Sequence, residues 1–151
     1  MRIPAMWRAL AVVTTLGWLE AASAQTSMSY VELNMGEHRI EAEVAATDSK
    51  RSFGLMYRSS LGSDSGMVFI FRAPVSLCMW MKNTLIPLSV AFIDSEGRII
   101  NMEDMTPQSE ETHCSRKPAR YALEVNQGWF RQRAIQVGDK VDGLLSLPPG
   151  Q

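Results

Sequence analysis

The sequence has few of the residues on which most catalytic and metal sites depend. Its 151 residues include only two histidines, His38 and His113, and two cysteines, and no G-x-S-x-G or H-E-x-x-H motif occurs. Neither a serine hydrolase nor a zinc protease is therefore indicated. The formal net charge is −1, and a chain so close to neutrality has no electrostatic footprint for nucleic acid or an anionic membrane.

Long hydrophobic runs are also missing. The apolar stretch at residues 9–19 spans 11 positions, whereas a membrane-spanning helix needs about 20. It follows Arg2 and Arg8 and precedes Ala22-Ser23-Ala24. A basic start, a short apolar stretch and an A-x-A end are typical of a secretory signal peptide. We therefore predict that residues 1–24 are a signal peptide and that the protein is exported, to the periplasm.

The predicted mature chain, residues 25–151, has the size of one ordinary domain. Removal of residues 1–24 takes away two arginines and one glutamate, which leaves 13 basic and 15 acidic side chains and a formal charge of −2. No cysteine stands near the cleavage site to carry a lipid. We expect a single soluble domain, a monomer or weak oligomer, that binds a small ligand and has no cofactor, nucleic-acid partner or membrane span.

The two cysteines, Cys78 and Cys114, form an even pair in a chain that we expect to enter an oxidising compartment. Such a pair is more often bridged than free. A bridge across 36 positions would constrain the unfolded chain by roughly 3–4 kcal/mol. Two buried free thiols, or two soft metal ligands, are the alternatives that stay open.

Much of the mature chain alternates between apolar and polar residues with the period of two that a half-buried strand requires. Two predicted turns join neighbouring strands, at Met35-Gly36-Glu37 and at Asp94-Ser95-Glu96-Gly97, where glycine supplies a positive φ. Residues 104–118 predict a long loop. The predicted strands are residues 30–34, 38–44, 67–71, 76–81, 88–93, 98–103, 120–125 and 141–147.

Two short helices complete the prediction. Thr47 is a suitable N-cap for a helix over residues 48–58, and residues 128–133 predict a helical turn. Gly54 inside the first helix predicts a close backbone approach, because glycine there costs about 1 kcal/mol relative to alanine. The predicted fold is α+β: a mainly antiparallel, curved or barrel-like sheet with one or two short helices. No alternating βαβ rhythm supports a parallel sheet.

Five segments, taken together and in order, resemble one known family, which is the uncharacterised prokaryotic family named domain of unknown function 192. This resemblance implies a compact, largely β domain that is often exported. It brings no established activity and no catalytic residues. The segments are 54–58 (GLMYR), 66–69 (GMVF), 80–88 (WMKNTLIPL), 91–94 (AFID) and 121–128 (YALEVNQG).

The clearest candidate site is the polar interruption Lys82-Asn83-Thr84 within an otherwise apolar run. These residues make either the turn between two strands or the polar floor of a binding site. If residues 77–83 are extended, Trp80 and Lys82 point to one side. A lysine–carboxylate pair beside an indole ring suits a small polar or saccharide-like ligand. The candidate ligand-binding residues are Trp80, Lys82, Asn83, Asp94, Glu103 and Asp104.

The favoured function is non-catalytic binding of a small polar or envelope-derived ligand, and no catalytic residues are assigned. One alternative is a hydrolase of an envelope saccharide, in which Asp94 with Glu103 or Asp104 would form a carboxylate pair roughly 5–9 Å apart. A second alternative is copper binding, because thioether and thiolate ligands suit Cu(I). Its candidate ligands beside the cysteines are Met102, Met105 and His113.

Overall fold

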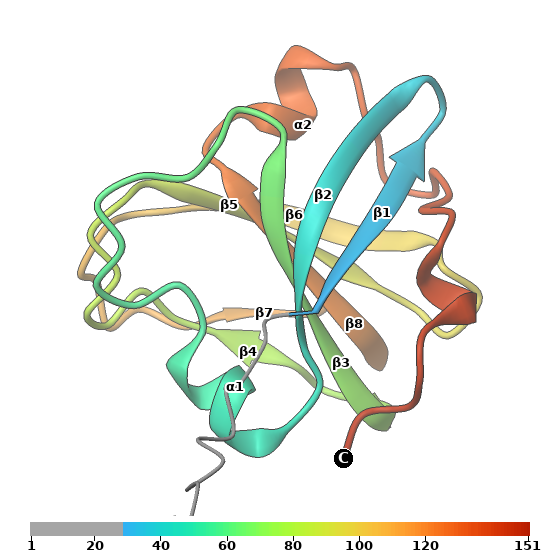
Figure 1. Ribbon diagram of the computed structural model, residues 1–151, viewed down its shortest axis with the longest axis horizontal. Coiled ribbons are helices and arrows are strands. Elements are labelled where there is room, and N and C mark those ends of the chain that lie inside the picture. The colour runs from blue at the N-terminus through green and yellow to red at the C-terminus, as the bar shows by residue number, and fades with distance from the viewer. Residues whose placement is uncertain (1–28) are drawn as a thin grey trace, which may run out of the picture.

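The computed structural model describes residues 29–151 (Figure 1). The predicted signal peptide and its cleavage point lie outside the described residues. Within residues 29–151, no helix has the length and apolar character needed to cross a membrane.

Six strands form one open, twisted sheet in the order β1-β2-β3-β8-β5-β6. All neighbouring strands are antiparallel except β2 and β3, which are parallel. The predicted mainly antiparallel α+β fold is confirmed, but β1 and β6 are free edges, so the sheet does not close into a barrel. The strands are β1 (Tyr30–Met35), β2 (His38–Ala45), β3 (Ser65–Val75), β5 (Leu88–Ile93), β6 (Ile99–Met105) and β8 (Ala119–Asn126).

The parallel pairing of β2 with β3 is the one exception in a sheet that is, as predicted, mainly antiparallel. Residues 46–64 connect the two strands and contain helix α1 (Asp48–Phe53). A crossover of a dozen or more residues is what parallel neighbours require. The helix in this crossover has only six residues, so the sequence lacks the long helical pattern by which a βαβ unit is recognised.

Helix α1 begins where it is predicted to begin but ends earlier. The Thr47 hydroxyl accepts a hydrogen bond from the Lys50 N–H at 3.3 Å, as an N-cap does. Gly54 then ends the helix with a φ of 52°. A Cβ atom at Gly54 would lie 3.3 Å from Cζ of Phe69 on β3. The predicted close approach is therefore present, but it occurs at the C-terminal end of the helix.

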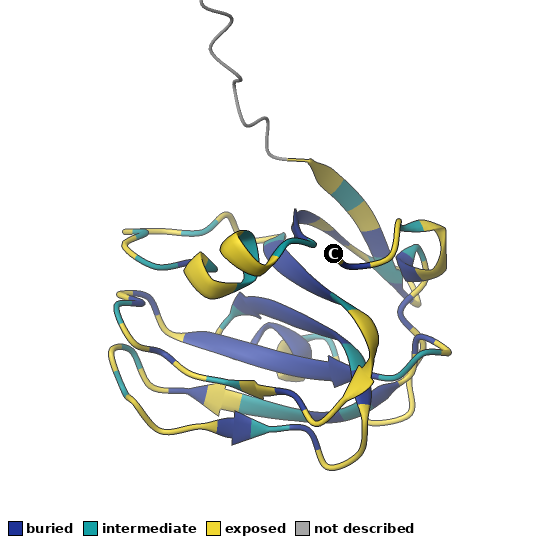
Figure 2. Ribbon diagram, turned by 90° about the horizontal axis from the view of Figure 1, so that it is seen from below, coloured by how far each residue is buried: buried dark blue, intermediate teal, exposed yellow. Residues whose placement is uncertain are grey.

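Each face of the sheet carries its own hydrophobic cluster. One face, which contains Phe69 and Phe92, packs against Leu55, Leu77 and Met81. Its cover consists of α1 with the loop that follows it and of a small sheet, β4 (Cys78–Met79) with β7 (His113–Cys114). The other face packs against α2 (Trp129–Gln132) and the 3₁₀ helix η1 (Leu144–Ser146). Figure 2 shows buried central strands beneath a more exposed cover.

Two strand predictions are corrected. The strand expected at residues 76–81 is reduced to the two residues of β4. The strand expected at 141–147 is instead a single bridge, from Asp142 to Asn34, followed by η1. Gly143 explains the change, because its φ is 98° and a Cβ there would lie 2.7 Å from the carbonyl oxygen of Glu32. The chain turns where it passes closest to β1.

Candidate functional site

The segment from Leu77 to Lys82 alternates as an extended chain does. Leu77 and Met81 are buried in the core, whereas Trp80 keeps 45% of its surface exposed. Lys82 is also exposed. The polar interruption at residues 82–84 therefore follows a segment that has one buried and one exposed side, and Trp80 belongs to the exposed side.

Lys82 is held by Trp80 and by a carboxylate outside the predicted set. Its Nζ lies 5.3 Å from the centroid of the indole ring of Trp80 and 3.3 Å from Oε1 of Glu110. Both Lys82 and Glu110 are largely solvated, so this ion pair contributes little to stability. The lysine nevertheless covers one side of the indole.

Asn83 has a backbone role. Its φ is 58°, a left-handed conformation that asparagine tolerates better than most residues. Its carbonyl oxygen accepts a 2.9 Å hydrogen bond from the N–H of Tyr57, and the Thr84 N–H bonds to the carbonyl oxygen of Met81 at 3.0 Å. Residues 82–84 thus form a turn, and that turn is tied to the loop that follows α1.

The remaining predicted carboxylates lie elsewhere. Asp94 is in the β5–β6 turn, where its Oδ1 accepts hydrogen bonds from the N–H groups of Glu96 (3.0 Å) and Arg98 (2.8 Å). It follows the last residue of β5, about 20 Å from the connection that precedes this strand. Asp104 accepts a hydrogen bond from the hydroxyl of Ser89 and pairs with Arg131 at 3.1 Å. The structure therefore does not place Asp94 and Asp104 with Lys82.

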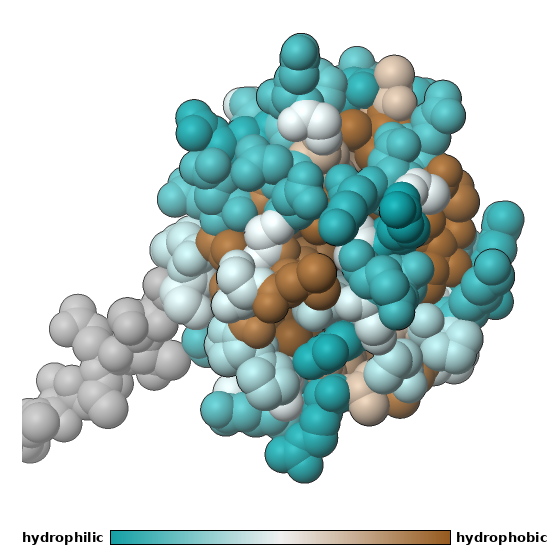
Figure 3. All heavy atoms as spheres, turned by 90° about the vertical axis from the view of Figure 1, so that its right-hand side faces the viewer, coloured by the Kyte–Doolittle hydropathy of each residue, from teal (hydrophilic) through white to brown (hydrophobic). Residues whose placement is uncertain are grey.

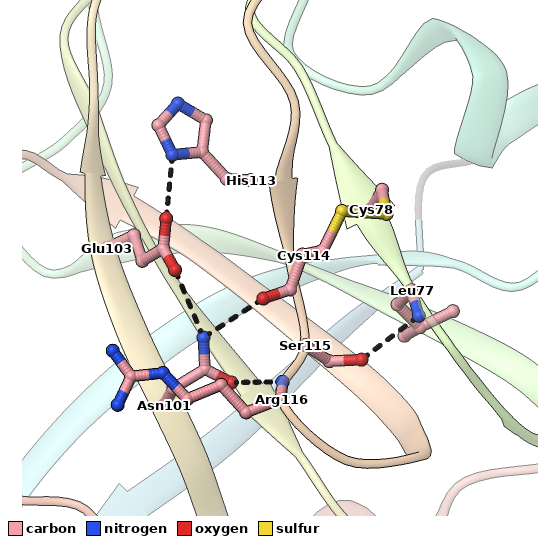
Figure 4. Close-up of a disulfide and its surroundings, with 8 residues drawn as sticks. All are labelled: Leu77, Cys78, Asn101, Glu103, His113, Cys114, Ser115 and Arg116. Atoms are coloured by element: carbon pink, nitrogen blue, oxygen red, sulfur yellow. Dashed lines mark hydrogen bonds and ion pairs between the residues drawn. A yellow bond between two sulfur atoms is a disulfide. The ribbon is translucent and has the colours of Figure 1, made fainter.

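Glu103 belongs to a polar network beside the disulfide between Cys78 and Cys114 (Figure 4). Its Oε2 lies 2.9 Å from Nδ1 of His113, and its Oε1 accepts a 3.3 Å hydrogen bond from the side-chain amide of Asn101. That amide also bonds to the carbonyl oxygen of Cys114 at 3.2 Å. The network fixes β7 and the disulfide to the edge strand β6.

The candidate copper ligands are not assembled. Met105 is buried in the cluster on the face that β4 and β7 cover, whereas Met102 packs against the cluster on the opposite face. Cys78 and Cys114 form a disulfide, so neither provides a thiolate ligand. Among the residues that the structure describes, no group of three or more His, Cys, Asp or Glu side chains is arranged to hold a metal ion.

Three glutamates lie in one row across the sheet, on the face covered by α1 and the β4–β7 pair. Glu43 on β2 and Glu124 on β8 are both opposite Met67 of β3. Glu124 and Glu103 on β6 are both opposite Val90 of β5. Since neighbouring strands are about 5 Å apart, successive glutamates in the row are about 10 Å apart.

Glu124, in the middle of the row, is the functional candidate that the sequence analysis does not include. Only 3% of its surface is exposed, and desolvation is the cause of its pKa shift, with no hydrogen bond or charge contributing. Its oxygens are not fully enclosed; the fully enclosed side-chain atoms without a partner within residues 29–151 are Nε2 of His113 and Nε of Arg120. Burial raises the pKa of Glu124 to about 8, because a charged carboxylate is poorly solvated there. At neutral pH this group is therefore mostly a neutral acid.

A narrow pocket opens above Glu124. It is lined by the end of α1 with Phe53 and Gly54 on one side, and by Trp80 and Thr84 on the other. Its volume is about 30 Å³, which admits a group of a few atoms, since a water molecule needs roughly 10–15 Å³ by the same measure. Phe53 and Trp80 are 55% and 45% exposed, so two aromatic side chains flank the entrance.

A sequence signal for Glu124 does exist. The residue interrupts the run Tyr121-Ala122-Leu123-Glu124-Val125, and glutamate is rarely buried unless it is paired. An interpretation by alternation places Glu124 on a solvated face. The structure instead puts β8 at the centre of the sheet with both faces covered, and sequence periodicity alone does not reveal that position.

A larger hollow of about 400 Å³ lies beside the C-terminus, and its lining includes Phe71, Arg72 and Gln151. The carboxylate side chain in this lining, that of Asp48, is 95% exposed. Figure 3 shows the face around the C-terminal segment as mainly hydrophilic with separate hydrophobic patches. The exposed apolar residues of the C-terminal region are Val137 and Leu145. Isolated exposed apolar residues are normal on soluble proteins, so the Glu124 pocket remains the strongest candidate site.

Comparisons with known proteins agree with this architecture. The chain is 26% identical over 110 residues to a UPF0127 protein of Pyrococcus abyssi (strain GE5 / Orsay), which covers 69% of this chain and 86% of the relative. A solved protein of unknown function from Novosphingobium aromaticivorans DSM 12444 superposes with a TM-score of 0.74 at 31% identity, covering 79% of this chain and 89% of that chain.

A second solved structure comes from Sinorhizobium meliloti 1021 and is provisionally described as a transcription regulator. It has a TM-score of 0.72 and 37% identity, and it covers 80% of this chain and 98% of that chain. The family model DUF192, described as "Uncharacterized ACR", matches residues 30–143. The chain therefore belongs to the DUF192 family.

Proposed function

We propose that the protein is exported to the periplasm and there binds a small polar ligand of cell-envelope origin without changing it chemically. The observation that carries this proposal is a buried carboxyl group, Glu124, that lines a pocket and has no partner within the described chain. Buried polar groups are normally hydrogen-bonded. A ligand that forms a hydrogen bond or ion pair with the Glu124 carboxyl group would therefore gain affinity, because water has poor access to this group.

The pocket entrance suits a polar molecule with an apolar side. Phe53 and Trp80 present partly exposed rings, and such rings commonly form the apolar surfaces of small-molecule sites. The pocket itself is small, so only the end of a ligand enters it, while the rest lies between the two rings. We propose that the protein does this as a monomer or weak oligomer.

A carboxylate-dependent hydrolase has less support. Hydrolysis of a glycosidic bond by two carboxyl groups requires them to be roughly 5–9 Å apart on one cleft. Among the described residues, Glu124 is the carboxyl group that lines this pocket. Its neighbours in the row, Glu43 and Glu103, are about 10 Å away and are engaged by Arg58 and His113.

Binding is tested by tryptophan fluorescence. The described residues contain two tryptophans, Trp80 at the pocket and the buried Trp129. A ligand-induced fluorescence change that is absent in the Trp80→Phe variant therefore comes from the pocket. The probe is a soluble muramidase digest of peptidoglycan. We expect a saturable change in the wild type and weaker binding in Glu124→Gln. A linear, unsaturable response in both proteins contradicts the proposed binding function.

Export is tested separately. The full chain is expressed in a Gram-negative host, and the periplasmic fraction is analysed by intact mass. We expect a chain that begins at Gln25 and has a mass 2 Da below that of the reduced form, from the two hydrogens lost on forming a disulfide. Uncleaved protein that remains with the cytoplasm contradicts the proposed export.

A further inference from the structure

The glutamates that flank Glu124 in the row each have a basic partner from the layer that covers the sheet. Arg58, in the loop after α1, binds both carboxylate oxygens of Glu43, at 2.5 and 2.6 Å. His113 of β7 binds Glu103 at 2.9 Å. The cover thus provides one basic group for each outer glutamate. The Glu43 side chain is 7% exposed and the Glu103 side chain is 32% exposed, so a partner matters most for Glu43, because a charge buried without a partner is costly.

The central glutamate differs from the outer two in having no basic partner within the described chain. Glu43 and Glu103 also line surface hollows, of about 300 and 410 Å³, but each is paired with a basic side chain. Glu124 lines the pocket that opens between Gly54 and Trp80. Gly54 keeps this side of the pocket open, because a Cβ atom there would approach the ring of Phe69 to 3.3 Å. The position equivalent to that of Arg58 or His113 is therefore accessible from outside the protein.

We propose that the ligand supplies the missing basic group, as a protonated primary amine at the end of a thin aliphatic stem that enters the pocket and pairs with Glu124. This inference rests on the proposed binding function and specifies its ligand class. No bond forms or breaks. The amine arrives protonated, and Glu124 releases its own proton to solvent when the ion pair forms.

The dimensions and lining of the pocket fit this class. A volume of about 30 Å³ is enough for a small group such as an ammonium with its adjoining methylene, since one water needs roughly 10–15 Å³ by the same measure. Thr84 lines the same pocket. Its hydroxyl donates to the carbonyl oxygen of Lys82 at 3.5 Å, so its lone pairs are available to accept from a second N–H. The rings of Phe53 and Trp80 flank the entrance, and aromatic faces attract cations.

The nearby positive charges, including that of Arg51, which also lines the pocket, are already engaged. The guanidinium of Arg51 donates to the carbonyl oxygens of Ala46, Ile70 and Gln151 at 2.6–2.7 Å, and its charge is paired with Asp48 at 2.5 Å. Lys82 is paired with Glu110. Met67 and Val90, the strand neighbours of Glu124, are uncharged. Neither cation is therefore a partner for Glu124.

The pH dependence of binding has a definite sign. An ammonium ion pairs with the carboxylate form of Glu124, so its affinity follows the ionised fraction of this group, which increases as pH rises towards 8. From about pH 6.5 to about pH 8.5 the affinity should increase more than tenfold, because the apparent affinity is proportional to the fraction of protein molecules in which Glu124 is ionised. A ligand that accepts a hydrogen bond from the neutral acid shows the opposite trend.

The experiment compares n-butylamine with n-butanol, a neutral probe of the same shape, by Trp80 fluorescence. We expect saturable binding of the amine that Glu124→Gln weakens at least about tenfold, because a charge-assisted pair is lost. Glu32→Gln removes the same charge from an exposed position and should leave the affinity unchanged. Equal binding of the alcohol, no loss in Glu124→Gln, or an affinity that falls with pH overturns the inference.

A second measurement separates this inference from the binding function and identifies the source of the amine. The peptidoglycan digest is titrated before and after its amino groups are acetylated. If acetylation abolishes binding of the digest, the ligand is an amine of the cell envelope. If n-butylamine or free putrescine binds but the untreated digest does not, the amine inference is supported and the ligand is a soluble polyamine. If the acetylated digest binds as well as the untreated one, the amine inference fails and the binding function stands. If neither digest nor amine binds, both fail.

Discussion

The backbone N–H of Tyr57 donates a 2.9 Å hydrogen bond to the carbonyl oxygen of Asn83, and both residues have a positive φ, of 63° and 58°. This bond joins the loop that follows α1 to the turn at Lys82-Asn83-Thr84. The two segments form opposite sides of the pocket above Glu124. The polar interruption in the sequence is therefore a turn, and the same turn holds one wall of the candidate site.

The left-handed conformation at Asn83 leads to the first prediction. Alanine at this position should lower the free energy of unfolding by about 1 kcal/mol, because left-handed backbone is costly for residues with a Cβ and asparagine is better suited to it. Glycine adopts the conformation freely, so Asn83→Gly should be more stable than Asn83→Ala. Urea denaturation measures both, and equal stability of the two variants would show that the left-handed turn is not maintained.

The disulfide leads to the second prediction. Cys78 and Cys114 are directly opposite each other on β4 and β7. Beside them, Leu77 and Ser115 are joined by two hydrogen bonds of 3.1 and 2.8 Å. Replacing both cysteines with alanine should reduce the free energy of unfolding by roughly 3–4 kcal/mol, from the added freedom of the unfolded chain. Urea denaturation with and without reductant is the measurement. A wild type that reductant does not destabilise argues against a structural role.

The buried pair of Arg58 and Glu43 leads to the third prediction. The Glu43 side chain is 7% exposed, so Arg58→Met leaves a buried carboxylate without its partner and should cost about 3 kcal/mol. The double variant Arg58→Met with Glu43→Gln should recover part of this loss. Chemical denaturation of the four proteins gives the coupling energy. Strict additivity of the two single changes would mean that the pair is not formed.

Part of the fold is predictable from local sequence. The β1–β2 hairpin and the turn at Asp94–Gly97 follow from alternation and from glycines that supply a positive φ, here 59° at Gly36 and 82° at Gly97. The cap at Thr47 also follows from residue type. These features depend on neighbours within a few positions, and such neighbours are visible in a sequence.

Other features depend on contacts between distant segments. The end of α1 at Gly54 is set by the approach to Phe69 on β3, and the turn at Gly143 is set by the approach to β1. The row of glutamates requires the strand order, in which β8 lies between β3 and β5. Without that order, the sequence shows Glu103 and Glu124 only as carboxylates near the ends of two strands, and it does not show that β8 is covered on both faces.

Protonation of Glu124 leads to the fourth prediction. Burial raises the pKa of Glu124 from 4.5 to about 8, so between these values the folded protein holds a proton that the unfolded chain has lost. The free energy of unfolding should therefore fall as pH rises, by about 1.4 kcal/mol per pH unit, relative to the Glu124→Gln variant. Denaturation curves of both proteins from about pH 5 to pH 8 give this difference. The same pH dependence in both proteins would contradict the assignment.

The central claim is that Glu124 is a buried carboxyl group with no partner among residues 29–151, and an NMR titration of its ¹³Cδ resonance tests this claim most directly. The Glu124→Gln variant assigns the signal, since it removes only that resonance. The structure predicts a midpoint near pH 8 in the ligand-free protein. A midpoint near 4.5, as for a solvated glutamate, would show that the carboxyl group is already solvated or paired and would contradict the proposed site.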